Sequence, residues 1–240
     1  MTITDEIDYV REWRDGQIVA ISKIESKVHQ RILITACIDA FVQHQESVCA
    51  SRKQKRRTSA RNDFSVFLQK YVVEEPYHEW MRLVCPTTLY YDYCDNSLQT
   101  KLKLDQFSHY APDDPVAIQE AERLINLLPE DKQEKAREKH QYSALIYQMG
   151  NKLVHEMSYV GSDAIYFTEK SKKIPQMAIM KFTEDNKTIL KKWTLHIPID
   201  LLKYCLKEST DNYLNECLNQ QKRPLGDYDP FPKSIFAFYD

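Results

Sequence analysis

The chain has 240 residues, of which 42% are hydrophobic and 28% charged, a balance typical of a soluble globular protein with a sizeable core. Its four glycines disfavour both a glycine-rich phosphate loop and a turn-rich all-β fold. The formal net charge of −2 exerts no overall pull toward nucleic acid or a membrane. Binding to nucleic acid would therefore require a local patch of positive charge.

Signals for metal binding and targeting are missing from the sequence. The six cysteines are scattered, and none forms a Cys-x-x-Cys pair or has a zinc-like spacing to histidine. The N-terminus is acidic and lacks the apolar region of a signal peptide, and no window approaches the ~18 apolar residues of a membrane span. We therefore expect a cytoplasmic protein with reduced thiols, no metal or other cofactor and no membrane contact.

Helical periodicity dominates the N-terminal part of the chain. Apolar residues recur with the helical period across residues 18–48, which predicts one long helix that stops at the basic segment 51–59. A second helix is predicted over residues 60–73, because Pro76 cannot continue it. Pro86 suggests the start of a shorter helix.

The middle of the chain is predicted to be helical after a loop at residues 106–115, which contain two prolines and two aspartates. Asp114 and Pro115 have the pattern of an N-cap followed by the first helical position, so a helix should run from there to residue 128. Pro129 restarts the chain in a highly charged helix. This helix leads into another over residues 141–157, which carries an apolar stripe.

The pattern changes after Gly161. Residues 164–168, 176–182 and 193–197 are short segments rich in β-formers, and they predict a small antiparallel meander. Pro198 opens a final helix that reaches about residue 221.

The predicted fold is therefore mainly α, an antiparallel helical bundle with a small antiparallel β-sheet. We expect the bundle core over residues 1–160, and the sheet and final helix packed on it over residues 161–223. The tail at 224–240 is rich in proline and aromatic residues and is expected to dock on the rest.

The strongest functional signal is the segment 147–156, Tyr-Gln-Met-Gly-Asn-Lys-Leu-Val-His-Glu, which places Asn151 and His155 on one helix face. It resembles the Arg-Asn-x-x-x-His signature of the HEPN (higher eukaryotes and prokaryotes nucleotide-binding) helical domains. Many of those domains are metal-independent ribonucleases. The apolar helix around residues 32–40 and the segment 61–71 also resemble core helices of this family. The resemblance extends over residues 18–220.

The resemblance implies a homodimer in which His155 is the general acid and base and Asn151 supports it. In active relatives the histidine assists attack by the RNA 2′-hydroxyl, and the arginine stabilises the phosphate charge. This chain departs from the family because Gly150 occupies the arginine position. Lys152 lies about 200° around the helix from it. Since losing such a charge costs about 10²–10³-fold in rate, we expect weak or absent endoribonuclease activity.

Two further features each allow a functional and a structural interpretation. His155 is either the acid and base of the motif or a structural residue. It lies late in its helix, where the helix dipole would stabilise a protonated imidazole even if the residue had no catalytic role. A basic run either contacts RNA phosphates or forms a solvated loop between helices. The run consists of Arg52, Lys53, Lys55, Arg56 and Arg57.

Three functions are compatible with these patterns. The first is a HEPN-like bacterial or phage protein that binds or cleaves RNA, in a defence or toxin system. The second is a HEPN-like module without catalysis that works through dimerisation or protein interaction, which Gly150 favours. The third is a helical protein unrelated to this family.

Overall fold

The computed structural model describes residues 2–49, 60–94, 107, 110–155, 176–184 and 187–224. For residues 44, 46–49, 152, 154–155, 176–184 and 187–196, only the course of the backbone is described. The described part is mainly helical, as the sequence predicts.

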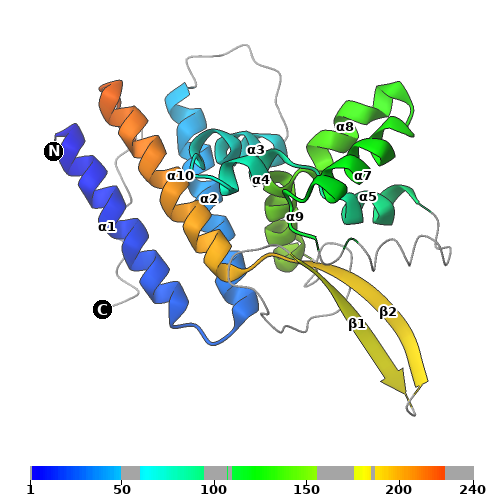
Figure 1. Cartoon of the computed structure of the whole chain (residues 1–240). Helices are drawn as coiled ribbons and strands as arrows, with labels where there is room; N and C mark the ends of the chain where they lie inside the picture. The colour runs from blue at the N-terminus through cyan, green and yellow to red at the C-terminus, as the bar shows by residue number, and fades with distance from the viewer. Residues whose placement is uncertain are drawn as a thin grey trace.

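Three long helices lie side by side at one end of the molecule (Figure 1). They are α1 (Ile3–Ser22), α2 (Lys27–Cys49) and α10 (Ile199–Asn219). Next to them lie α3 (Ala60–Tyr71) and α9 (Tyr142–His155), which pack against each other and against α2, and the short α4 (Tyr77–Arg82). The helices α5 (Pro86–Tyr93), α7 (Pro115–Asn126) and α8 (Glu130–His140) form a group at the other end.

The single helix predicted over residues 18–48 is wrong, because the chain reverses between α1 and α2. Lys23 ends α1, and the Gln30 side chain then donates to the Ile24 carbonyl at 2.5 Å, which holds the turn together. The apolar period continues across the turn because both helices bury their faces in one core, where Ile21 is 3% exposed. A capping box between Thr2 and Asp5 starts α1 and was the sequence signal for this missed helix.

Other predicted elements agree more closely with the structure. The Asp114 side chain accepts a hydrogen bond from the Val116 backbone at 2.8 Å, so it is the N-cap of α7 with Pro115 at the first helical position. The chain turns at Gln141 between α8 and α9, and Pro198 precedes α10. The short helix α4 was not predicted.

Two strands, β1 (Gln176–Glu184) and β2 (Lys187–His196), pair as an antiparallel hairpin with Gln176 opposite His196. The hairpin extends away from the helices (Figure 1). Residues 164–168 lie outside the described part of the chain, so the three-stranded meander stays a prediction.

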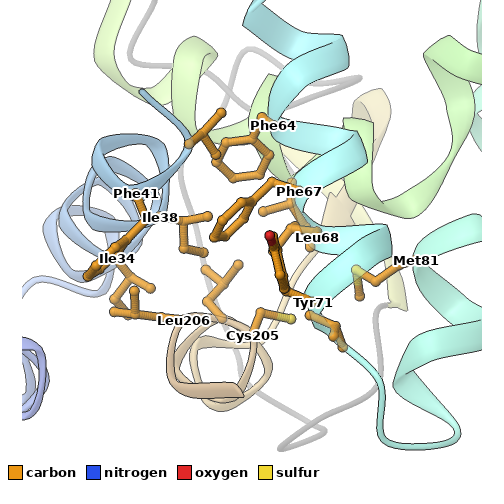
Figure 2. Close-up of a cluster of buried hydrophobic side chains, with 14 of the residues drawn as sticks. Ile34, Ile38, Phe41, Phe64, Phe67, Leu68, Tyr71, Met81, Cys205 and Leu206 are labelled. Carbon is orange, nitrogen blue, oxygen red and sulfur yellow. The ribbon is translucent and has the colours of Figure 1, made fainter. Parts of the chain in front are cut away.

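The main hydrophobic core lies where α2, α3 and α10 meet, and α10 is a central helix of the bundle. Figure 2 shows side chains from these helices pointing toward one another: Ile34, Ile38, Phe41, Phe64, Phe67, Leu68, Tyr71, Cys205 and Leu206. Their burial is the dominant favourable contribution to folding. A smaller core joins α5, α7 and α8. The domain boundaries expected at residues 160 and 223 stay predictions.

Candidate functional site

The motif glycine lies at a close contact between two helices. Gly150 is buried in α9, where it packs against Thr35 of α2. A Cβ atom at position 150 would lie 2.8 Å from the Thr35 Cβ, and nearer still to its Cγ2. Thr35 is 5% exposed, and its hydroxyl donates to the Arg31 carbonyl at 2.9 Å. Because a β-branched side chain is stiff, only glycine fits here without a shift of one helix.

A pocket of about 150 Å³ opens beside this contact. The helix α2 contributes four residues and α9 three: Ile32, Thr35, Ala36, Asp39, Tyr147, Gly150 and Asn151. Thr35 and Gly150 are buried and form the floor, whereas Ala36 and Asn151 are exposed at the rim. The same close packing that excludes a side chain at position 150 therefore shapes a small concave site.

The polar groups of the pocket come from both helices. The Asp39 carboxylate accepts one hydrogen bond, from Gln43 at 2.9 Å. The Tyr147 ring packs on Phe64 of α3, with ring centroids 5.4 Å apart. Burial raises the pKa of Tyr147, and the nearby Asp39 carboxylate raises it further, so the phenol is protonated and able to donate at neutral pH.

Arg61 of α3 supplies a positive charge that acts on a side chain of this site. Its charge opposes the rise in the pKa of Tyr147, so Tyr147 lies within the electrostatic reach of both Arg61 and Asp39. The Arg61 Nε is buried and makes no hydrogen bond to the described residues. A buried N–H without a partner is energetically costly.

The structure describes only some of the predicted site residues. Asn151 is exposed at the rim of the pocket. His155 is the last residue of α9, one turn beyond Asn151, and its side chain lies outside the described part. The five basic residues from Arg52 to Arg57 also lie outside it.

Asp39 and Tyr147 were not predicted as site residues. The available signal was a single carboxylate in the otherwise apolar stretch around Asp39. Tyr147 carried no such signal, because an aromatic residue on a helix is usually a packing residue.

We find no family model, curated protein or solved structure that matches this chain. Within the described part of the chain, no helix has the length and apolarity required to cross a membrane. Nor do its His, Cys, Asp and Glu side chains gather in threes or more to form a metal site. The site must therefore be interpreted from its own chemistry.

Proposed function

We propose that this chain is a HEPN-like, RNA-related binding protein with little or no endoribonuclease activity of its own. The observation that supports this most is the close contact between Gly150 and Thr35. An arginine at position 150 would require a Cβ where Thr35 already lies, so the helix packing excludes the residue on which the chemistry of active relatives depends. Of the remaining motif, Asn151 lines the pocket.

Acid and base chemistry alone would not replace the missing charge. His155 could transfer a proton, but a pentacoordinate phosphate also needs a cation close to its oxygens. Lys152 follows Gly150 by two residues, a spacing of about 200° around an ideal helix. Binding without efficient cleavage is the outcome expected of such a site.

A second candidate function is a non-catalytic dimerisation or protein-interaction module, for example in a defence or toxin–antitoxin type system. The hairpin of β1 and β2 favours it. This hairpin extends away from the bundle (Figure 1), and the described sheet has two strands, so each has one edge without a described neighbour. Such edges accept an added strand from a partner.

The test is cleavage and binding of a mixed RNA pool in EDTA by the full chain and by His155→Ala. We expect both proteins to bind RNA and neither to cleave it appreciably. Neutralising Arg52, Lys53, Lys55, Arg56 and Arg57 together should flatten the salt dependence of binding. Robust cleavage that disappears in His155→Ala would contradict the proposal, and absence of RNA binding at low salt would favour the interaction module.

A further inference from the structure

The pocket between α2 and α9 is small, and its size limits the ligand. Its volume is about 150 Å³, similar to a protein cavity of about 150 Å³ that holds a benzene molecule. One six-membered ring therefore fits. Because the pocket is open at its rim, the remainder of a larger ligand can extend into solvent.

The chemistry of the walls indicates a flat, polar ring. Ile32 and Ala36 offer apolar surface to its faces. Asp39 keeps acceptor capacity beyond its bond from Gln43, the protonated Tyr147 can donate, and the Asn151 amide can do both. A ligand that forms hydrogen bonds with all three of these side chains must carry at least one N–H donor next to acceptor atoms.

The charges near the pocket argue against a simple cation as the ligand. Asp39 is negative, but Arg61 lies within electrostatic reach of the same Tyr147 side chain. Arg61 does not line the pocket, but its charge and that of Asp39 act on Tyr147 in opposite directions. A neutral ring with an attached anion suits them better, because the ring occupies the pocket and the anion lies toward Arg61.

We propose that this pocket binds the cytosine ring of a nucleotide or of single-stranded RNA, an inference that rests on the proposed RNA-related function. Cytosine carries an exocyclic amine, which donates to a carboxylate, beside two acceptors, which suit the donors of Tyr147 and Asn151. Uracil presents a carbonyl in place of the amine, and Asp39 repels it. Uracil can reach the Asp39 carboxylate only through its N3–H, which brings a carbonyl oxygen on each side toward the same negative charge, so we expect it to bind more weakly than cytosine. Purines carry a second fused ring, so the pocket would enclose only part of the base and bury less of its surface.

The inference is tested by calorimetric titration of the full chain with CMP, UMP, AMP and GMP. We expect CMP to bind with a Kd in about the millimolar range, and UMP to bind at least about tenfold more weakly. Asp39→Asn supplies an amide that can donate to the uracil carbonyl, so the CMP preference should disappear or reverse. Asn151→Ala should weaken CMP binding.

The matched control is Asp131→Asn, on the exposed surface of α8 and away from the pocket. It removes the same charge and should leave the ratio of CMP to UMP affinity unchanged. A purely structural role of Asp39 would alter stability but not this ratio. Equal affinities of the wild type for CMP and UMP, or an unchanged ratio in Asp39→Asn, would overturn the inference.

Short RNA strands distinguish a free nucleotide from single-stranded RNA as the ligand. They also distinguish failure of the cytosine pocket from failure of the proposed RNA-related function. Oligouridine with one central cytosine should bind more tightly than oligouridine if the ligand is RNA. Binding of CMP without binding of either strand would assign the pocket to a free nucleotide and would contradict the RNA-related function alone. Binding of both strands with equal affinity would contradict the cytosine pocket alone, and absence of all binding would contradict both.

Discussion

Gly150 and Gly16 are both helical glycines, but they have opposite surroundings. A Cβ at position 16 would meet nothing within 4 Å, whereas one at position 150 would meet Thr35. Gly16→Ala should therefore raise the free energy of unfolding by up to about 1 kcal/mol, the usual helix propensity difference. Gly150→Ala should lower it by about 1–3 kcal/mol, because overpacking outweighs the propensity gain. Urea unfolding followed by circular dichroism measures both.

A second substitution checks that Thr35 is the cause. Thr35→Ala removes the Cγ2 and the hydroxyl but leaves the Cβ, which would still lie 2.8 Å from the new methyl group. It should therefore recover only part of the loss in the Gly150→Ala chain, with a coupling energy of about 0.5–3 kcal/mol in a double-mutant cycle. Strict additivity would show that the contact does not limit residue 150.

His140 couples the stability of the smaller helical group to pH. It is 2% exposed, and its Nδ1 lies 2.9 Å from the Thr88 hydroxyl oxygen. Since that hydroxyl donates to the Cys85 carbonyl at 3.0 Å, Nδ1 is the donor. The Nε2 lies 3.3 Å from an Asp92 carboxylate oxygen.

Three charged residues near His140 act on its pKa from three helices. Burial lowers the pKa of His140, Asp92 of α5 opposes this, and Lys139 of α8 and Arg61 of α3 lower it further. The adjacent His140 imidazole, with Lys139, in turn lowers the pKa of Asp92 to about 2. These shifts agree, because Asp92 titrates in a range where His140 is already protonated.

Acidification should therefore destabilise the fold in two stages. Both groups have lower pKa values when folded, so the unfolded chain binds more protons as the pH falls. The His140 contribution is present above its ordinary pKa of 6.5 and is lost below it, and the Asp92 contribution is lost between its ordinary 3.8 and about 2. His140→Gln should flatten the upper stage in urea titrations at successive pH values. An unchanged slope near pH 6 would show that His140 does not titrate on unfolding.

At the level of the helices, the buried Arg14 links α1 to α10 through hydrogen bonds and an ion pair. The Arg14 guanidinium is 2% exposed and donates to the Asp211 carboxylate at 2.5 Å and to the Lys207 carbonyl at 3.2 Å. Asp15 accepts a further bond from it at 2.9 Å. Arg14 lies on the inner face of α1, so its charge requires partners supplied by α10.

Removing one partner of this pair should loosen the contact between the two helices. We expect Asp211→Asn to lower the free energy of unfolding by about 2–4 kcal/mol. The effect should be smaller than that of leaving Arg14 without any anionic partner, because Asp15 still pairs with it. The control is Asp8→Asn, which removes an exposed pair with Arg11 and should cost no more than about 1 kcal/mol. Equal effects of the two substitutions would show that burial of Arg14 adds nothing to the pair.

At the scale of the whole molecule, the proposed family implies a homodimer that joins the Asn151 and His155 faces of two copies. Sedimentation at micromolar concentration should then show a dimer. Asn151→Glu should weaken it by about tenfold or more, because a two-fold axis brings like charges of the two copies near each other. Glu134→Gln, on exposed α8, serves as the surface control. A monomer at all these concentrations would contradict the dimer.

The fold was largely predictable where local chemistry decides it. Asp114 and Pro115 mark the start of α7, and Pro198 marks the start of α10, because caps and proline act within one turn. The reversal between α1 and α2 was not predictable from the apolar period. Ile21 and Val28 belong to different helices but face the same core, so the period alone does not reveal the turn.

The candidate site shows the same division. Helical spacing and residue identity were enough to predict that Asn151 and His155 share a helix face and that position 150 lacks a side chain. The reason for a glycine at position 150, and the identity of the residues beside it, follow from the packing of α9 against α2. Thr35 and Asp39 are more than a hundred residues from α9 in sequence, and packing of α2 against α9 brings them to the pocket. Such contacts depend on how distant faces are buried together, which no local pattern encodes.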